Sequence, residues 1–182
     1  MLKSFDSALG FMAFFIDRGE VLAITFGHPT GAVARESLHK LLASSGIPTS
    51  DANADSVEDS FLAEQLEERL TCFAKGEAVD FDDLPISLAG LTRFQRLVVA
   101  ACRAIPWGET LTYGELAESV GHPGAARAVG SVMSSNRIPL VIPCHRVLAS
   151  GGRLGGYSAP QGLAMKERLL EAEQAALAEL AQ

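Results

Sequence analysis

The order of apolar and polar residues in the first half of the chain indicates two strands followed by two helices. Short apolar segments at 11–16 and 21–26 are separated by turn-forming residues, a spacing that predicts a β-hairpin. Apolar residues then recur at helical intervals over 33–42 and 61–73, which predicts two amphipathic helices, the second ending near Gly76. This half of the chain therefore has the pattern of a small α/β domain.

Two segments of the same half are predicted to be connections. Residues 44–57 are rich in Ser, Asp and Asn and contain a proline, which indicates an exposed loop. Residues 80–90 combine several acids with a proline and a glycine, and we place a domain boundary inside this segment. The sequence thus predicts two domains, 1–87 and 88–182.

Glycines and prolines divide the second half into a long C-terminal helix and three short helices, predicted at 92–104, 113–119 and 125–134. Residues 112–115 have the form of a capping box, and residues 158–161 repeat that form before the C-terminal helix. Pro123 is expected to begin the third short helix, because proline is favoured at the first helical position. Two short helices joined by a tight glycine-containing turn form the pattern of a helix-turn-helix, although such hairpins also occur as plain core.

Length and composition limit the class of protein. At 182 residues and 48% hydrophobic content, the chain can bury one large core or two small ones. No apolar run approaches the roughly 18 residues of a membrane-spanning helix, and the first residues lack a secretory pattern. Three cysteines are an odd and sparse number, which fits a reducing compartment and not a disulfide framework. These features predict a cytoplasmic protein with no membrane partner.

The net charge of −7 is unevenly distributed between the predicted domains. Residues 1–87 carry 6 Lys and Arg against 15 Asp and Glu, a net −9, whereas residues 88–182 carry 9 against 7, a net +2. Ordinary variation among solvated surfaces would explain this difference. The alternative is an acidic domain that stays away from phosphate and a mildly basic domain that contacts it over a small footprint.

The candidate chemistry centres on Cys144, which stands between Pro143 and His145. A free thiol has a pKa of about 8.5 and is mostly protonated at neutral pH, and a neighbouring imidazole oriented by a carboxylate can activate it. Pro143 fixes its own φ, so stiff backbone holds the thiol. Most lone cysteines are small core residues, however, and neighbours in sequence need not meet in space. Spacing alone leaves Cys144 open between a nucleophile and a packing residue.

The remaining cysteines and two of the histidines are assigned no chemistry. Cys72 and Cys102 lie in apolar helical patterns and are predicted to be packing residues. His28 and His39 lack cysteine or carboxylate partners at ligand spacing, so no metal site is predicted.

A series of further motifs accompanies Cys144 in order along the second half of the chain. They are Phe94-Gln95, Ile105-Pro106-Trp107-Gly108-Glu109-Thr110, Tyr113-Gly114-Glu115-Leu116-Ala117, Ala125-Ala126-Arg127-Ala128-Val129-Gly130, Asn136, Pro143-Cys144-His145-Arg146-Val147, Gly155-Gly156-Tyr157-Ser158 and the segment 166–173. Together they resemble the O6-alkylguanine-DNA alkyltransferases, also called methylated-DNA–protein-cysteine methyltransferases. Residues 1–87 resemble the variable N-terminal domain of this family only in outline.

The resemblance implies an α+β fold in two parts. The N-terminal part would be a ribonuclease-H-like α/β domain with a small antiparallel sheet. The C-terminal part would be mainly helical, with a winged-helix-like helix-turn-helix and the alkyl acceptor.

The resemblance also implies the chemistry. In this family a cysteine takes the alkyl group from O6 of guanine in DNA, without a cofactor and once per molecule. Carried to this sequence, Cys144 would be the nucleophile and His145 would withdraw its proton through a water. Glu173, in preference to Glu171, would orient His145.

Three further residues complete the implied catalytic group. Tyr113 resembles the tyrosine that approaches N3 of the base, and Asn136 resembles the residue that joins the recognition helix to the active-site loop. Lys166 is expected to help position the Tyr113 hydroxyl. A purely structural role stays open for the tyrosines and the asparagine, because such groups also occur as core residues whose hydrogen bonds are satisfied.

The resemblance also implies a substrate pocket, with a tyrosine wall and a serine donor to O6. It is formed by Met133, Val147, Tyr157, Ser158 and Ala159.

A guanine inside a duplex is out of reach of a thiol, so the implied partner, double-stranded DNA carrying O6-alkylguanine, has to present it flipped out. Arg127 resembles the arginine that takes the place of the base in the stack. Small residues around it would let the helix approach the minor groove, which carries little sequence information, although they could equally reflect tight helix packing. The implied DNA-binding residues are Arg127, Tyr113, Ala126, Ala128, Gly130, Ser131 and Arg137.

Further expectations are O4-alkylthymine as an additional lesion, a monomeric state, and a location at the nucleoid if the source is bacterial. Three departures from the family pattern stand out. Arg137 stands where many relatives have proline, so its loop is expected to be less rigid or more strongly attracted to phosphate. Ala159 stands where some relatives have glycine, so its methyl group would narrow the pocket, and Val98-Val99 replaces the common valine–tryptophan pair. Two other classes compete: an alkyltransferase-like protein that recognises the lesion without repairing it, and a Cys-His-Glu hydrolase. The presence of Cys144 argues against the first, and the second leaves Arg127 and Asn136 unexplained.

Overall fold

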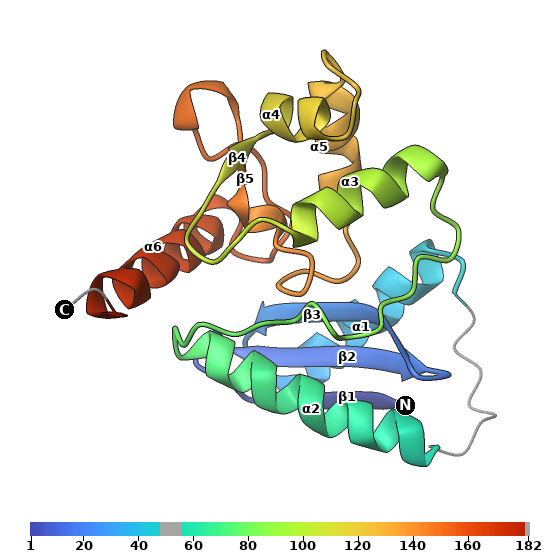
Figure 1. The fold of residues 1–182 in the computed structure, drawn as a ribbon. Coiled ribbons are helices and arrows are strands. Elements are labelled where there is room, and N and C mark those ends of the chain that lie inside the picture. The colour runs from blue at the N-terminus through green and yellow to red at the C-terminus, as the bar shows by residue number, and fades with distance from the viewer. Residues whose placement is uncertain (48–55, 181–182) are drawn as a thin grey trace. The chain divides into compact units, whose positions relative to one another are not determined.

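The computed structural model describes residues 1–47 and 56–180, and the chain divides into two compact units, Met1–Ser87 and Leu88–Gln182 (Figure 1). Of the loop expected at 44–57, residues 48–55 lie outside the described residues. Both units combine helices with short strands, so the chain has an α+β fold.

A three-stranded antiparallel sheet in the order β1-β2-β3 forms the centre of the first unit. Strands β2 (Phe11–Asp17) and β3 (Glu20–His28) are joined through Arg18 and Gly19, whose φ angles of 53° and 72° fit a two-residue hairpin turn. The predicted hairpin is therefore confirmed. The sequence pattern does not predict β1 (Leu2–Phe5), because its four residues are too few for a clear alternation.

Helix α1 (Gly31–Ser44) packs on one face of this sheet, and Figure 1 shows α2 (Val57–Ala74) on the other. Both predicted helices are confirmed. Each is longer than its apolar pattern because Thr30 and Ser56 cap the helices upstream of the first buried residue. The α1 side of the sheet is filled by a cluster of small and branched side chains, Ala13, Ala23, Ala34, Leu38 and Leu42.

The second unit contains α3 (Arg93–Arg103), β4 (Leu111–Thr112), α4 (Tyr113–Ser119), α5 (Ala126–Ser134), the 3₁₀ helix η1 (Cys144–Arg146), β5 (Val147–Leu148), the 3₁₀ helix η2 (Ser150–Gly152) and α6 (Leu163–Leu180). The three short helices and the C-terminal helix are confirmed. The capping box at Thr112 is also confirmed, since its side chain accepts from the Glu115 N–H and the Glu115 side chain accepts from the Thr112 N–H. The parallel pairing of β4 with β5 has no local signal, because each strand is only two residues long.

Two expected helix starts in this unit are wrong. Pro123 lies in a turn that the Ala125 N–H closes onto the His122 carbonyl at 3.1 Å, and α5 begins only at Ala126. Ser158 does not cap α6 either. The Gly162 N–H donates to the Ala159 carbonyl at 2.8 Å, and this turn delays the helix to Leu163.

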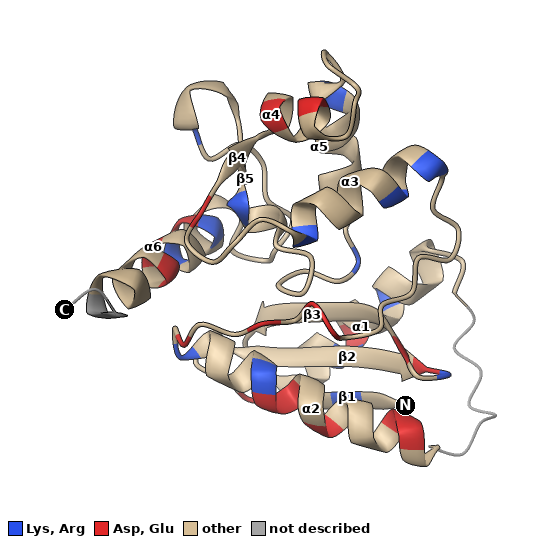
Figure 2. Ribbon diagram, in the orientation of Figure 1, with Lys and Arg blue, Asp and Glu red and all other residues tan. Residues whose placement is uncertain are grey.

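The sign of the charged residues on the helices differs between the two units. Figure 2 shows Asp and Glu along α2 of the first unit, and Lys and Arg on α3 of the second.

Over the described ranges 1–47 and 56–180, none of the helices combines the length and the apolar character that a membrane span requires.

We expect Leu38→Ala to destabilise the first unit by about 2–5 kcal/mol, because Leu38 is fully buried between α1 and the sheet and its removal leaves a cavity. Urea unfolding followed by circular dichroism would measure this change. Val33→Ala on the same helix is the matched control, since Val33 is 38% exposed. Equal losses in the two variants would contradict the placement of Leu38 in the core.

Candidate active site

Backbone geometry presents Cys144 at the start of η1. Pro143 has φ −77° and ψ 61°, and the Cys144 N–H donates across it to the Ile142 carbonyl at 2.7 Å, which are the features of an inverse γ-turn. The Arg146 N–H then donates to the Pro143 carbonyl at 2.9 Å. These bonds and the proline ring hold the thiol on rigid backbone.

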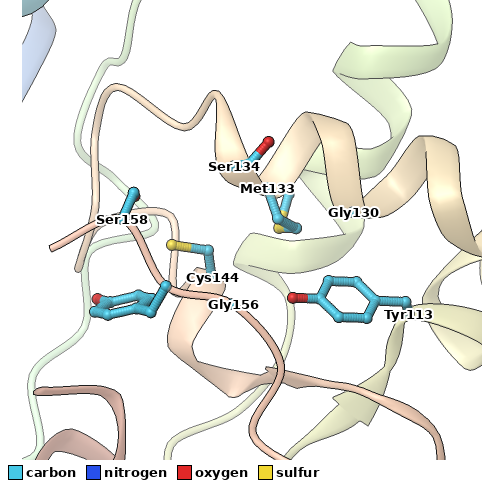
Figure 3. A pocket seen from close by; sticks show the side chains of 8 residues that line it. Tyr113, Gly130, Met133, Ser134, Cys144, Gly156 and Ser158 are labelled. Atoms are coloured by element: carbon cyan, nitrogen blue, oxygen red, sulfur yellow. The ribbon is translucent and has the colours of Figure 1, made fainter. Parts of the chain in front are cut away.

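The thiol faces a cavity in the second unit. Figure 3 shows the Tyr113 hydroxyl directed toward the space beside Cys144, with Met133 on the α5 side. Cys144 is only 4% exposed, so a reacting group has to enter the cavity to reach it. The cavity has a volume of about 380 Å³, within the range of small-ligand sites, and its wall is formed by Tyr113, Gly130, Met133, Ser134, Cys144, Gly156, Tyr157 and Ser158.

Asn136 connects the end of α5 to the Cys144 loop. Its Nδ2 donates to the Ile142 carbonyl at 2.9 Å and to Cys144 Sγ at 3.2 Å, while its Oδ1 accepts from the Ile138 N–H at 2.9 Å. Its own N–H donates to the Met133 carbonyl at 3.2 Å. The side chain therefore fixes the loop and contacts the sulfur at once.

His145 points away from the solvent and pairs with Glu173 of α6. The two residues are 0% and 1% exposed, and His145 Nε2 lies 2.8 Å from Glu173 Oε1. The other carboxylate oxygen accepts from the Gly108 N–H at 3.0 Å. Glu171, by contrast, is exposed on the same helix, so the structure places Glu173 and not Glu171 beside the histidine.

The protonation states follow from these surroundings. Burial raises the pKa of the Cys144 thiol, and the Asn136 hydrogen bond and the Lys166 charge offset this only in part. Burial lowers the pKa of His145 against the opposing effect of Glu173. Burial would raise the pKa of Glu173, but hydrogen bonds from His145 and Arg146 bring it down to about 2. At neutral pH the site holds a thiol, a neutral imidazole and a carboxylate. Because Nε2–H donates to Glu173, Nδ1 is the basic nitrogen.

Lys166 is fully buried beneath two tyrosines. Its Nζ donates to the Val147 carbonyl at 2.6 Å and lies 6.0 Å from the ring centres of both Tyr113 and Tyr157. Burial lowers its pKa. The Tyr157 hydroxyl is buried without a hydrogen-bond partner among the described residues. Lys166 thus supports both tyrosine walls through their rings, and no hydrogen bond to the Tyr113 hydroxyl is among its described contacts.

Most of the predicted DNA-contact residues lie on α5 or just after it, while Tyr113 is the first residue of α4. Arg127, Ala128 and Ser131 are exposed, whereas Ala126 and Gly130 are partly covered. Arg137 is half-buried, and its Nη2 donates to the Ala89 carbonyl at 3.3 Å. This bond attaches Arg137 to the segment before α3, so the loop that carries it is anchored despite the missing proline.

The structure brings most of the predicted pocket together but omits two members. Val147 is fully buried with its side chain outside the cavity wall, and Ala159 does not line the cavity, so the Ala159 methyl group does not narrow it. Sequence reasoning missed Ser134, which follows Gly130 by one helical turn, and Gly156, which stands in the Gly-Gly-Tyr-Ser motif. It also missed the contacts that Trp107, Gly108 and Arg146 make with Glu173, although all three stand in motifs that accompany Cys144. Among the residues the structure describes, no group of His, Cys, Asp and Glu is placed to hold a metal ion.

Comparison with known proteins decides the family. Residues 93–175 match the model described as 6-O-methylguanine DNA methyltransferase, DNA binding domain. A methylated-DNA–protein-cysteine methyltransferase of Methanosarcina acetivorans is 41% identical over 117 residues, which are 64% of this chain and 72% of that protein. The chain belongs to the 6-O-methylguanine DNA methyltransferase family.

Other relatives of this methyltransferase family extend the comparison. A methylated-DNA–protein-cysteine methyltransferase of Mycolicibacterium paratuberculosis is 47% identical over 107 residues, and the match spans 59% of this chain and 62% of that protein, less than two thirds of its length. The structure of Mycobacterium tuberculosis OGT in complex with DNA superposes with a TM-score of 0.69 at 30% identity, covering 96% of this chain and 93% of that one. The O6-methylguanine-DNA methyltransferase of Pyrococcus kodakaraensis gives a TM-score of 0.68 at 27% identity, covering 95% and 99%. The structural likeness thus includes the first unit, which the sequence matches largely omit.

We expect the charge state of Glu173 to make stability depend on pH. Its pKa is about 2 in the folded chain against 4.5 unperturbed, so the stabilisation is complete above about pH 4.5 and is lost as the pH falls toward 2. Glu173→Gln removes this contribution, on the order of 3 kcal/mol at neutral pH. Denaturant unfolding between about pH 7 and about pH 3 should show the gap between the two proteins narrowing as the pH falls.

The control is Glu171→Gln, which removes an exposed carboxylate two positions earlier on α6 and should leave the pH dependence of unfolding unchanged. A gap between Glu173→Gln and the unaltered protein that stays constant with pH would contradict the buried ion pair.

Proposed function

We propose that this protein repairs DNA by direct reversal, transferring the alkyl group of O6-alkylguanine irreversibly to Cys144. The single observation that carries the proposal is the Cys144 thiol on the wall of a cavity of about 380 Å³, beside the buried His145–Glu173 pair. The names of the relatives, which are methylated-DNA–protein-cysteine methyltransferases, agree with this chemistry.

The transfer exchanges one proton for one alkyl group. His145 Nδ1 accepts the thiol proton through a bridging water, and Glu173 balances the charge of the imidazolium that forms. The thiolate then forms a C–S bond to the alkyl carbon as the bond from that carbon to O6 breaks. The electron pair remains on the guanine, which regains one proton and leaves as the normal base. The thioether has no route back to the thiol, so each molecule reacts once and needs no cofactor.

Guanine leaves more readily when hydrogen-bond donors stabilise the negative charge that develops on it in the transition state. The Tyr113 hydroxyl, which points into the cavity, is suited to reach N3 of the base. Ser158 on the opposite wall is suited to donate to O6, and the Tyr157 ring adds apolar surface to the lining of the cavity. Lys166 holds both tyrosine rings from below.

The target base is flipped out of the duplex by a helix-turn-helix of winged-helix type, formed by α4 and α5. The exposed face of α5 carries small residues, Ala128 and Ser131 among them, which permits close approach to a minor groove. Arg127 is exposed near the start of the helix and takes the place of the flipped base, an exchange that offsets a few kcal/mol of lost stacking. Arg137 and the backbone at Ala126 and Gly130 add contacts to the adjacent strand.

The first unit fits a ribonuclease-H-like domain, because its antiparallel sheet in the order β1-β2-β3 lies between two helices. Its net charge of −9 over residues 1–87 favours keeping this unit away from the DNA phosphates.

We expect O4-alkylthymine to be repaired by the same alkyl transfer, and we expect a monomer that acts on DNA in the cytoplasm or nucleoid. A protein that only recognises the lesion would have no use for the activated thiol, and a hydrolase would leave Arg127 and Asn136 without a role.

Incubation with an oligonucleotide duplex carrying O6-methylguanine should add one methyl group to Cys144 and none to Cys72 or Cys102. The reason is that Cys144 alone faces the cavity, whereas Cys102 is fully buried and Cys72 lies in the first unit. Peptide mass spectrometry measures the result. Cys144→Ala should bind the duplex and remain unmodified. Sustained turnover, or a methyl group on another cysteine, would refute the assignment.

Arg127→Ala should slow repair of duplex DNA while it leaves the reaction with free O6-benzylguanine nearly unchanged, provided the cavity admits that base. Arg127 is assigned to the flipped state of DNA and does not line the cavity. Single-turnover rates on the two substrates measure the difference. Ser119→Ala, an exposed change on α4 outside the cavity wall, serves as the control. Equal losses on both substrates would show that Arg127 has another role.

A further inference from the structure

Arg146 is a buried cation that shares the carboxylate of Glu173 with His145. Its Nε donates to Glu173 Oε1 at 3.1 Å and to Oε2 at 3.0 Å, and its Nη2 donates to Oε1 at 2.9 Å. His145 Nε2 meets the same Oε1 at 2.8 Å. One carboxylate oxygen therefore serves the active-site histidine and the arginine that follows it in the chain.

The other contacts of Arg146 fix it to the loop between α3 and β4. Its Nη1 donates to the Ile105 carbonyl at 2.6 Å, and its guanidinium carbon lies 5.6 Å from the centre of the Trp107 ring, a cation–π distance. Trp107 in turn donates its indole N–H to the Glu173 carbonyl at 3.2 Å, and the Gly108 N–H holds Oε2 at 3.0 Å. None of these loop residues lines the cavity.

We propose that Arg146 is a positioning residue for alkyl transfer, which holds the Glu173 carboxylate in line with His145 and takes up a share of its negative charge. The proposal rests on the alkyl-transfer function argued above. Arg146 touches neither the cavity nor Cys144 Sγ, so it acts on the reaction only through Glu173 and His145.

The shared charge determines how readily His145 takes a proton. The pKa of His145 is lowered first by burial and then by the positive charges of Arg146 and Lys166, while Glu173 opposes them. Without Arg146, the full charge of the carboxylate would act on the imidazole. The imidazolium would then persist to higher pH, and a protonated His145 cannot accept the thiol proton of Cys144.

Few ionised groups share this environment. Lys166 of α6 is a cation, but its Nζ donates to the Val147 carbonyl and not to Glu173. Burial raises the pKa of Cys144 and of three side chains that interact with it electrostatically, which keeps all four uncharged at neutral pH; the three are Cys102 of α3, Tyr113 of α4 and Tyr157 of the loop before α6. Within the described part of the chain, Arg146 is therefore the side-chain cation bonded to Glu173.

Two substitutions separate the charge of Arg146 from its geometry. Arg146→Gln keeps an amide donor and removes the charge, so the titration midpoint of His145 should rise by about one unit or more. Arg146→Lys keeps the charge but cannot reach both carboxylate oxygens, so the midpoint should stay near that of the unaltered protein while transfer slows roughly tenfold or more. Arg96→Gln removes an exposed arginine of α3 and should change neither quantity.

The midpoint is measured by NMR of histidine labelled with ¹³C and ¹⁵N, with His145 identified by its disappearance in His145→Gln. The acid limb of the single-turnover rate on O6-methylguanine duplex should move upward in Arg146→Gln by the same amount as the midpoint. Thermal unfolding establishes that each variant is folded.

An unchanged His145 midpoint in folded Arg146→Gln overturns the proposal. If Arg146→Gln does not fold, Arg146→Lys decides, since an undiminished transfer rate in that variant overturns the positioning role. The NMR titration does not require transfer. Absence of transfer in the unaltered protein, with the midpoint shifts intact, would therefore count against the proposed function and not against the role of Arg146.

Discussion

The buried carboxylate of Glu173 is the interaction on which the arrangement of the second unit depends. An ionised carboxylate at 1% exposure would cost several kcal/mol if it lacked partners. Its partners come from two segments that are distant from α6 in sequence, namely the loop that contains Gly108 and the 3₁₀ helix that contains His145 and Arg146. The charge can be buried only when these segments meet, and their meeting also fixes the ring of His145, the residue that follows Cys144. The contacts that stabilise the second unit are therefore the same contacts that assemble the site.

The same burial creates a conflict at Cys144. A thiol that is only 4% exposed has a raised pKa and is protonated at rest, so it is a poor nucleophile until a base takes its proton. In the proposed reaction this conflict is met by a neutral His145 next to a Glu173 that is ionised at neutral pH, and by the Asn136 amide on the sulfur. For the single-use reaction proposed above, a resting thiol protects the protein from wasteful alkylation or oxidation. Reactivity then depends on a ligand that fills the cavity and positions its carbon against the sulfur.

Sequence patterns predicted the longer elements because local periodicity and caps determine them. The hairpin, α1, α2 and α3 each show a repeat of buried residues, and the capping box at Thr112 fixes the start of α4 by purely local bonds. The errors lie where tertiary contacts decide. Pro123 and Ser158 have favourable local chemistry for a helix start, but turns closed by the Ala125 and Gly162 N–H groups delay both helices. The two-residue strands β4 and β5 exist only because the second unit brings them together.

The site residues that stand next to one another in a sequence motif could be predicted. The contacts and the cavity that form between segments distant in sequence could not. Adjacency in the Pro-Cys-His-Arg motif pointed to Cys144 and His145, whereas nothing local reveals that Arg146 turns inward to the same carboxylate as its neighbour. The cavity wall is a further example, because it combines α4, α5 and the loop before α6. Gly155, at φ 67°, lets this loop approach so closely that a Cβ there would lie 3.2 Å from the Tyr113 ring. A side chain at 155 would therefore displace the Tyr113 wall, whereas Ala159, outside the wall, leaves the cavity unchanged. The width of the cavity, and with it the range of alkyl groups that the proposed reaction would admit, depends on how this loop packs against Tyr113.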